Sequence, residues 1–467
     1  MSRSFTSAVG SLLSLMIVAP AFAGCESDNA STPQADAGSG TFDSGPGTDA
    51  SVPSTCPPVT GPGTTHAQTP TVDETWSAAA SPHVIETNLS IPAGRTITVE
   101  PCAVVRLKGA VGMLIEGKLL ALGAADKPIR FERGDAAVAW RSIETRTGSE
   151  LRLAHVTVDG GGDSGGGQLT QFGALDIRGN QDLAPQPIFF ADHVTVKGSQ
   201  SLGIQVREGG AFAPGSQDLS ITGGATFPIS IWGRSAGTLP SGTYTGNAVD
   251  EIILPVKGGT DDIKEDTTFA ARGVPYRIGG PTGGKSLTVA GNGSIPLLTI
   301  EPGVTLRFDK EVRLELDSSA GAALGALRAE GTADKPIVFT SAAATPAAGD
   351  WVGIVIEGTP DARDKIAYAK ISFAGGASQI SSYDCPSPLN AGFSNEAAIV
   401  IAGGQPATAF VTNTTIDSSA GDGIVRGWTG TPVELLATNT FTSITRCNQT
   451  FPKPQVGACP VPAPCPK

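Results

Sequence analysis

Short stretches of alternating apolar and polar residues dominate the chain from residue 75 onward. They run for about 4–7 residues, are rich in Val, Ile, Thr and Leu, and are separated by Gly, Pro, Asp and Asn, as β-strands usually are. Typical segments are 96–99, 104–107, 151–158 and 193–197. Outside an apolar run at 12–19, no helical periodicity extends over ten or more residues. The pattern therefore predicts an all-β protein.

These segments occur in two copies. The stretch TVEPCAVVRL at 98–107 resembles TIEPGVTLRF at 299–308, and 116–131 shares ten of its sixteen residues with 324–339. The order of matches continues through Trp140 and Trp351, 153–161 and 368–376, 174–177 and 398–401, and 190–199 and 410–419. Such an ordered series predicts a tandem duplication. We place a first module at 75–265, a second at 266–450, and a Pro- and Cys-rich tail at 451–467.

Two all-β architectures accommodate such strands: a pair of sandwiches, or a solenoid in which each coil adds one strand to each of two or three parallel sheets. Isoleucines recur at intervals close to one coil of roughly 20–25 residues, as expected where side chains of one type stack on a dry inner face. They are Ile115, Ile143, Ile177, Ile204 and Ile231 in the first copy, and Ile354, Ile399 and Ile424 in the second. This spacing favours a parallel β-helix. We expect residues 76–85 to cover its N-terminal end and residues 447–465 its C-terminal end.

Three motifs of the second copy carry a family resemblance: LTIEPGVTLRF at 298–308, ALRAEGTADKPIVFTS at 326–341 and DWVGIVIEG at 350–358. They resemble the repeat signature of bacterial right-handed parallel β-helix surface proteins of the pectin-lyase-like kind, which include many tethered lipoproteins. The first copy carries the same elements in altered form, with Cys102 in place of Gly303. The resemblance implies a right-handed coil, in which the repeated tryptophans cap or fill a corner, and it implies almost nothing about activity.

The N-terminus has the layout of a secretory signal: Arg3, an apolar run, and small residues up to residue 24. The run is too short for a transmembrane helix to be assigned. Ala21-Phe22-Ala23 fits ordinary cleavage, whereas Phe22-Ala23-Gly24-Cys25 resembles a lipobox in which Cys25 is lipidated. Residues 25–74 contain no Lys or Arg and are rich in Ser, Thr, Gly, Pro and Asp, so we expect a disordered tether. We therefore expect a lipid-anchored protein of the bacterial outer membrane or cell surface, with a secreted or periplasmic protein as the alternative.

Seven cysteines are present. If Cys25 carries lipid, six remain, and an even number in an oxidising compartment predicts disulfides. The six are Cys56, Cys102, Cys385, Cys447, Cys459 and Cys465. Spacing does not fix their pairing, although we prefer Cys56 with Cys102 and the other four among themselves. A zinc site is not indicated, because no C-x-x-C occurs and the four histidines are scattered in the sequence.

Composition excludes several classes. Charged residues are only 16%, which argues against a long helical protein or coiled coil. The net charge of −12 argues against nucleic acid as a partner, because that affinity depends on cationic contacts to phosphates. The expected partners are instead a membrane, through the lipid, and a polysaccharide or surface protein.

Candidate chemistry is sparse. Many right-handed β-helices are polysaccharide lyases, which need an acidic calcium cluster and a basic residue on one face. Asp159 and Asp163 in a Gly-rich loop are weak calcium candidates, because they lack the spaced ligands of a defined calcium loop. The acids Asp261, Asp262, Glu265 and Asp266 fit a solvated junction between the modules better than a site. The N-T-D, G-H-G and R-x-K elements of hydrolases with this fold are missing, so we assign no catalytic residue, no metal and no cofactor.

His155 and His193 both precede Val-Thr-Val and lie in strand-like segments one or two coils apart. They can stack on one face as an imidazole pair, although two outward surface histidines are the simpler interpretation. Alignment of the copies puts Lys370 and Asn413 in their places. Neither residue would be expected from a required catalytic pair.

Three functions are compatible with these features. The favoured one is a non-catalytic envelope lipoprotein that presents a rigid β-helix surface for adhesion or ligand binding, with glycans as a possible ligand. The first alternative is a polysaccharide lyase or glycoside hydrolase, which three or more convergent acids and a base on adjacent coils would indicate. The second alternative is a structural component of the envelope.

Overall fold

A computed structural model describes residues 53–162, 172–180, 182–258, 261–280, 284–378, 385, 395–459 and 465. All of them belong to the compact unit Ser51–Lys467. Their regular structure is almost entirely β-strand, and the two helices, η1 (Ala78–Ala80) and η2 (Gly233–Thr238), are short 3-10 segments. Within the described ranges, no helix has the length and apolar character needed to cross a membrane.

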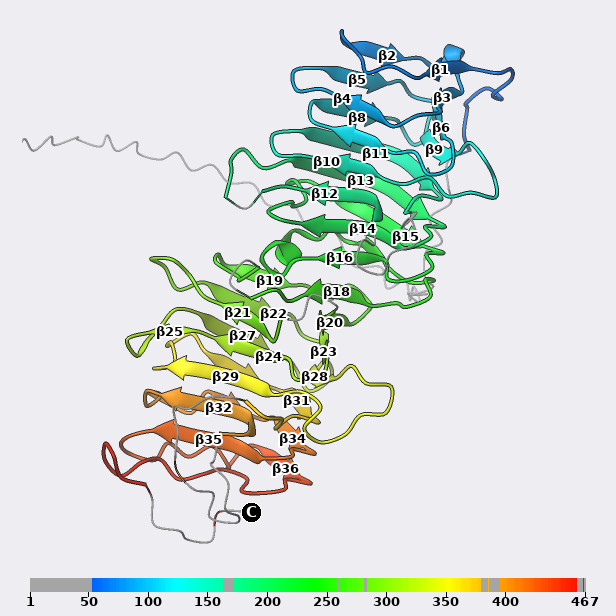
Figure 1. Ribbon diagram of the computed structural model, residues 1–467. Coiled ribbons are helices and arrows are strands. Elements are labelled where there is room, and N and C mark those ends of the chain that lie inside the picture. The colour runs from blue at the N-terminus through cyan, green and yellow to red at the C-terminus, as the bar shows by residue number, and fades with distance from the viewer. Residues whose placement is uncertain are drawn as a thin grey trace, which may run out of the picture. The chain divides into compact units, whose positions relative to one another are not determined.

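Successive coils stack strand upon strand into three faces, which we call the first, second and third face in the order in which the chain visits them (Figure 1). Among the described strands all pairings are parallel, except for the short hairpin of β25 (Ser318–Ser319) and β26 (Ala322–Ala323). This arrangement confirms the predicted parallel β-helix. The antiparallel sandwich alternative is excluded, because its strands would pair as hairpins.

In the first copy, β11 and β13 are long enough to span the first and second faces. The first face contains β2 (Glu74–Trp76), β5 (Thr96–Val99), β8 (Lys118–Leu122) and the beginnings of β11 (Glu150–Asp159) and β13 (Ile188–Lys197). The second face contains β1 (Thr64–His66), β3 (His83–Ile85), β6 (Val104–Leu107), β9 (Ile129–Arg133), the ends of β11 and β13, β15 (Gln217–Thr222) and β17 (Gly242–Thr243). The third face contains β4 (Leu89–Ile91), β7 (Met113–Ile115), β10 (Ile143–Thr145), β12 (Gly173–Arg178), β14 (Leu202–Arg207), β16 (Ile229–Ile231) and β18 (Ile252–Pro255).

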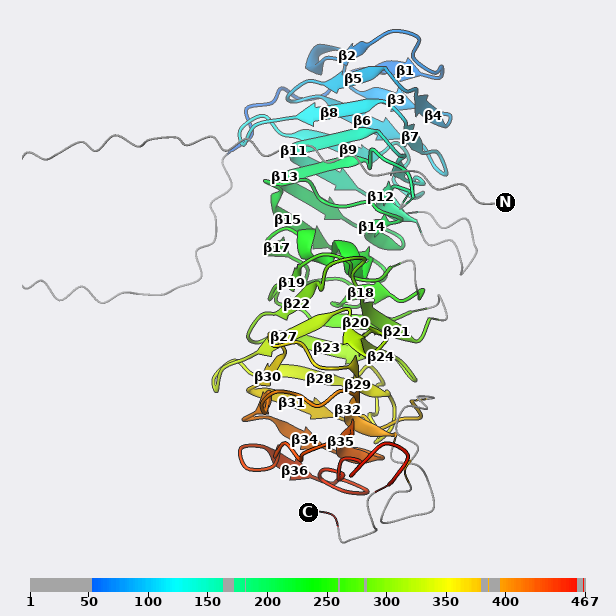
Figure 2. The same ribbon diagram turned by 90° about the vertical axis from the view of Figure 1, so that its left-hand side faces the viewer.

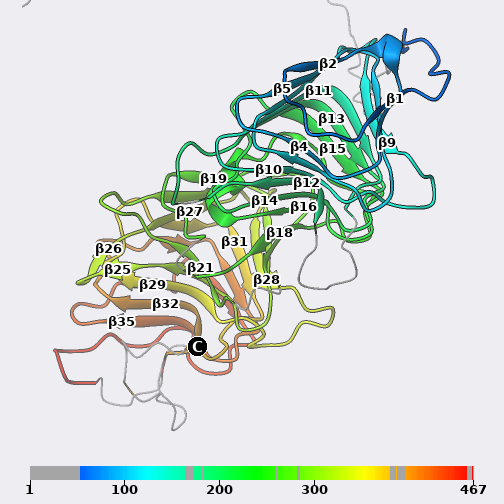
Figure 3. The same cartoon turned by 45° about the horizontal axis from the view of Figure 1, so that its top comes forward.

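In the second copy the chain visits the three faces in strict rotation. The first face contains β19 (Thr267–Phe269), β22 (Leu297–Ile300), β27 (Ala326–Glu330), β30 (Lys365–Ala367) and β33 (Val411–Thr412). The second contains β20 (Tyr276–Gly279), β23 (Thr305–Phe308), β28 (Ile337–Ser341), β31 (Ala369–Ser372), β34 (Thr415–Asp417) and β36 (Thr440–Thr442). The third contains β21 (Ser286–Val289), β24 (Arg313–Leu316), β29 (Gly353–Gly358), β32 (Ala397–Gly403) and β35 (Asp422–Trp428), of which β29, β32 and β35 lie side by side in Figure 3.

The two copies are joined out of phase. The third face of the first copy continues through β16, β18 and β20 into the second face of the second copy, forming one 13-stranded sheet (Figure 2). Ile252 on β18 pairs with Tyr276 on β20 across this junction. The predicted module boundary near residue 265 therefore falls inside a continuous sheet, and each face of the second copy is shifted by one relative to the first.

The inward side chains form columns along the coil, because parallel strands in register place like positions on top of one another. Ile354, Ile399 and Ile424 stack as a single column, as the spacing predicts. The isoleucines of the first copy divide between two columns: Ile143 and Ile204 share one with Leu175, whereas Ile177 and Ile231 share the next with Val206. A shift of two residues keeps a side chain on the same face of a strand, so spacing alone did not separate the columns.

The predicted tether ends earlier than expected. Strand β1 lies inside residues 25–74 and pairs with β3, with Thr64 opposite His83. A disulfide joins Cys56 to Cys102, the pairing preferred from the sequence. These contacts hold residues whose composition alone argued for disorder, because a covalent link and backbone pairing do not require apolar side chains.

The tryptophan corners and the C-terminal end follow the expected plan, whereas the N-terminal end is covered by residues upstream of 76–85 as well, because β1 pairs with β3. Trp140 and Trp351 are fully buried, and their indole N–H groups donate to the carbonyls of Asp159 and Ser372, at 2.8 Å in each case. Trp76 is buried at the N-terminal end, where its ring stacks on that of His83 at a centroid distance of 5.3 Å. At the C-terminal end, disulfides join Cys385 to Cys459 and Cys447 to Cys465.

Asp422, near the C-terminal end, makes the free energy of unfolding depend on pH. Its carboxyl is fully buried, and one oxygen accepts the N–H of Cys447 at 2.8 Å while the other has no hydrogen-bond partner among the described residues. Burial raises the pKa of Asp422 to about 6, against the opposing charge of Arg446 and with support from Glu396. Between about pH 4 and 6 the folded protein therefore keeps a proton that the unfolded chain has lost, so this group's contribution to stability falls as the pH rises.

We predict that Asp422→Asn removes the loss of stability that Asp422 causes as the pH rises. The variant should match the wild type near pH 4 and be more stable at pH 7, by up to roughly 3 kcal/mol, because a neutral amide avoids the buried charge. Urea unfolding at the two pH values measures the difference. Asp417→Asn, at a partly exposed position, is the control for the amide exchange. Equal stabilities of wild type and Asp422→Asn at pH 7 would contradict the prediction.

Candidate functional site

Charged side chains converge on the outer surface of the third face in the first copy. We call this group the charged row; it consists of Glu144, Arg146, Asp176, Arg178, Arg207 and Glu208, carried by β10, β12, β14 and the residues that follow them. They meet because Glu144 lies beside Asp176, and Asp176 beside Gln205, in the register of adjacent coils. Each coil thus contributes acidic and basic side chains to one network of ion pairs that runs across successive coils.

Asp176 lies at the centre of the charged row. It is fully buried, and Arg207 donates to both of its oxygens, from Nε at 3.0 Å and from Nη2 at 2.8 Å. Burial raises the pKa of the Asp176 carboxyl, and the Arg207 guanidinium opposes that rise. The same Nη2 lies 3.9 Å from Glu144, which also pairs with Arg146, while Arg178 pairs with Glu208 at 2.7 Å. Every acid of the charged row therefore has an arginine partner.

A cavity of about 280 Å³ opens beside the charged row, at the corner where the chain enters β4, β7 and β10. We call it the third-face cleft. Its lining includes Asn88, Ser90, Leu114, Arg141, Glu144 and Arg146. The Arg141 guanidinium lies 4.9 Å above the ring of Phe172, and it has no carboxylate partner among the described residues. The cleft thus offers a free cation, neutral hydrogen-bonding groups and a short apolar floor.

The second copy has a cleft at the corresponding corner. Its volume is about 340 Å³, and it lies where the chain enters β21, β24 and β29. Lys285, Lys310, Glu311 and Arg313 line it. Lys285 pairs with Glu311, and Arg313 pairs with Glu315. Both copies therefore place basic residues around a cavity at the corner before the third face.

The charged row itself is missing from the second copy. By strand register, Glu144, Asp176 and Gln205 correspond to Val355, Val400 and Val425, which are buried together with Cys385 and Val352. Valines therefore occupy the same backbone positions in the second copy, where they pack into an apolar cluster. Since the coil does not require charge at these positions, the charged row is a feature of the first copy beyond what folding demands.

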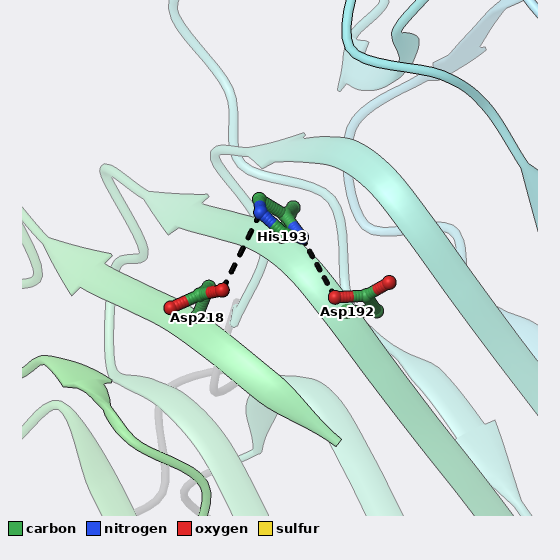
Figure 4. A group of neighbouring side chains, drawn as sticks. All are labelled: Asp192, His193 and Asp218. Carbon is green, nitrogen blue, oxygen red and sulfur yellow. Dashed lines mark hydrogen bonds and ion pairs between the residues drawn. The ribbon is translucent and has the colours of Figure 1, made fainter. Parts of the chain in front are cut away.

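The predicted histidine pair is present on the other side of the coil. His155 and His193 stack at a centroid distance of 4.6 Å, with φ values of 47° and 52° at the corner between the first and second faces. The carboxylates of Asp192 and Asp218 flank His193 (Figure 4). Sequence alignment named Lys370 as the counterpart of His155, and this is wrong.

The matched tryptophan contacts correct the alignment. Because Trp140 donates to Asp159 and Trp351 to Ser372, those two acceptors are equivalent positions. Counting back along the strands makes Tyr368, with a φ of 49°, the counterpart of His155. Asn413 remains the counterpart of His193, since its φ is 50° and the pairings on either side agree. The alternation of β-strands let the alignment slip by two residues without changing which side faced inward.

The other sequence candidates do not converge. Asp159 faces Lys197 at 3.4 Å, so a cation already neutralises it, and Asp163 lies outside the described residues, as does Cys25. At the junction, Asp261 is buried and accepts the N–H of Lys257 at 2.8 Å. Asp266 accepts the N–H of Leu297, also at 2.8 Å. Both acids bind backbone and have a structural role, but the expectation of a solvated junction is wrong for Asp261, because its carboxyl is buried.

Sequence reasoning missed the charged row. Its members are 32 residues apart from Glu144 to Asp176 and 31 from Asp176 to Arg207, and no motif links them. The one available signal was the contrast between the copies at 174–177, where ALDI faces AIVI. In these aligned apolar segments Asp176 corresponds to Val400, and this difference marked a position whose side chain points outward and serves a different purpose in the two copies.

Comparison with known proteins agrees with the fold. Residues 265–379 match the family model described as pectate-lyase like beta helix domain. Neither a curated protein nor a solved structure matches the chain. The match and the parallel three-faced coil show that the fold is a right-handed parallel β-helix similar to that of pectate lyases. The matched segment belongs to the second copy and excludes the charged row.

We predict that the charged row can be replaced by apolar residues if both partners are changed. Asp176→Val alone should lower the free energy of unfolding by about 3 kcal/mol, because it leaves the largely covered Arg207 without its main partner. The double variant Asp176→Val/Arg207→Met should recover most of that loss. Urea unfolding compares the two. If the double variant were as unstable as the single one, the charge would be a requirement of the fold.

Proposed function

We propose that this protein is a non-catalytic envelope lipoprotein whose β-helix binds an anionic glycan in the third-face cleft. The observation that carries the proposal is Arg141, which lines the cavity beside the charged row and has no carboxylate partner among the residues that the structure describes. An arginine guanidinium forms two parallel hydrogen bonds with a carboxylate or sulfate. Asn88, Ser90 and Glu144 add groups suited to sugar hydroxyls.

Two further features support this choice. The basic cleft recurs at the corresponding corner of the second copy, around Lys285, Lys310 and Arg313. Two sites on one rigid body suit a polymer, because the second contact forms at high effective concentration. The overall charge of −12 makes a nonspecific attraction for polyanions improbable, so binding has to come from local groups such as these.

The cellular location is part of the proposal. The signal-like N-terminus, Cys25 and the acidic segment that follows support attachment to a membrane by a lipid. The three disulfides support an extracellular or envelope location, where such bonds persist. A surface-held β-helix would present its clefts to polymers outside the membrane.

A lyase or hydrolase is the second candidate, because one observation favours it. Glu144, Asp176 and Glu208 are three acids on adjacent coils, accompanied by arginines, which is the arrangement expected of such an enzyme. Their arginine partners argue for the non-catalytic alternative, since acid–base catalysis needs a group that exchanges its proton with substrate. Of these acids Glu144 also lines the third-face cleft, so one set of measurements on that cleft separates the two candidates.

We predict that polygalacturonate binds and that neutral dextran does not. Arg141→Ala should weaken the affinity at least tenfold, because it removes the free cation of the cleft, and added salt should weaken binding further. Arg130→Ala, a half-exposed arginine of the second face, is the matched control. Calorimetric titration measures the affinities. Equal affinity of Arg141→Ala and wild type would reject the site, and release of unsaturated or reducing sugar that disappears in Glu144→Gln, an acid that lines the cleft, would favour the enzyme.

We also predict that the mature chain begins at Cys25 and carries acyl groups. Expression in a bacterial host followed by mass measurement of the N-terminal peptide should give a diacyl or triacyl adduct, and Cys25→Ser should abolish it. Detection of an unmodified N-terminus after Ala23 would instead support ordinary secretion.

A further inference from the structure

His193 is held between two carboxylates at the corner of the first and second faces. It lies on β13 at a φ of 52°, and Asp218 on β15 has a φ of 50° at the same corner one coil further on (Figure 4). Both backbones are left-handed, a conformation that His and Asp adopt more readily than most residues. The partly buried side chain of Asp192 and the exposed side chains of His193 and Asp218 bring one ligand atom each within 4.8 Å of one another.

The hydrogen bonds of His193 leave one nitrogen unexplained. Its Nδ1 lies 2.7 Å from Asp192 Oδ1, so a neutral imidazole donates its proton there. Nε2 then carries a lone pair, and it faces Asp218 Oδ2 at 3.4 Å. Two acceptors that face each other repel, and a cation between them, either a second proton or a metal ion, removes that repulsion.

The distances favour a metal ion. An N–H···O bond to a carboxylate is about 2.7–2.9 Å long. Two ligand atoms bound tetrahedrally at about 2.0–2.1 Å from zinc lie about 3.3–3.4 Å apart. The observed 3.4 Å between Nε2 and Oδ2 fits the second case. The bond from Nδ1–H to Asp192 is also the contact that orients metal-binding histidines in proteins.

The charge around the cluster points the same way. Several carboxylates of the first copy pair with Lys or Arg, as Glu150 does with Lys118 and Asp159 with Lys197. Within the described part of the chain, neither Asp192 nor Asp218 has such a partner. Gln217 donates to Asp192 at 3.1 Å, and His155 stacks on the His193 ring and fixes its orientation. The cluster therefore holds two uncompensated negative charges around an oriented imidazole.

We propose that His193 Nε2 and Asp218 form a binding site for a first-row divalent transition metal such as Zn²⁺, with Asp192 orienting the imidazole. Imidazole together with carboxylate suits Zn²⁺, whereas Ca²⁺ and Mg²⁺ take oxygen ligands. Open coordination positions accept water or an oxygen group of another molecule. The site lies on a different corner from the third-face cleft and does not depend on the proposed glycan binding.

The second copy lacks this site. Asn413 occupies the place of His193, and Thr412 that of Asp192. The metal therefore binds to the first copy, and loss of a single histidine there should remove it.

Calorimetric titration of untagged protein with Zn²⁺ tests the proposal. The wild type should bind one equivalent more than His193→Ala, and Asp218→Asn should lower the affinity of that equivalent at least tenfold. The test compares wild type with His193→Ala, and does not use total Zn²⁺ binding, because His66 and His83 near the N-terminal end offer other nitrogen ligands. Asp159→Asn, on the same face and paired with Lys197, is the matched control and should bind like the wild type. Equal Zn²⁺ binding by wild type and His193→Ala would overturn the site.

Proton NMR of His193 separates the metal from the proton. Zn²⁺ should shift its ring signals at pH 7, and the Asp218→Asn variant should need at least tenfold more Zn²⁺ for the same shift. A ring that stays protonated above pH 7 and ignores Zn²⁺ would show that a proton is the bridging cation and would refute the metal site. All substituted side chains are partly exposed, so thermal unfolding should confirm that each variant is folded.

Discussion

The structure depends on one constraint: parallel strands in register place each residue directly against its counterpart on the next coil. Inward positions must then stack like on like, and the isoleucine column through Ile354, Ile399 and Ile424 meets that condition with side chains of one shape. The backbone hydrogen bonds run along the coil, so each coil is stabilised mainly by its two neighbours. Only the ends lack a neighbour, and the disulfides join chain segments there.

The same constraint arranges the outward side chains in regular rows, so that functional groups from successive coils lie next to one another. A residue that points outward on one coil lies beside its equivalents on the coils before and after, however far apart they are in sequence. The charged row around Asp176 and the cluster around His193 both arise in this way. Their equivalents in the second copy are valines in one case and Thr412 with Asn413 in the other. Duplication has thus kept the core and let the outer positions diverge.

Because the copies are joined out of phase, equivalent strands of the two copies do not continue the same sheet. The third face of the first copy leads into the second face of the second copy through β18 and β20. Equivalent corners, including the two basic clefts, therefore lie on different faces of the continuous stack. The backbone ladder tolerates this shift, because parallel pairing depends on register and not on which repeat supplies the strand.

The sequence alone determined the all-β class, the duplication and the coil, because strand periodicity and repeated turn residues are local signals. It also favoured the disulfide between Cys56 and Cys102. It failed where a two-residue slip leaves the pattern unchanged, as in the alignment of Lys370 with His155. It also placed residues up to 74 in a disordered tether, although β1 lies within them. Only the tertiary structure decided the phase of the junction and the convergence of the charged row, because both depend on contacts between residues that are distant in sequence and carry no shared local pattern.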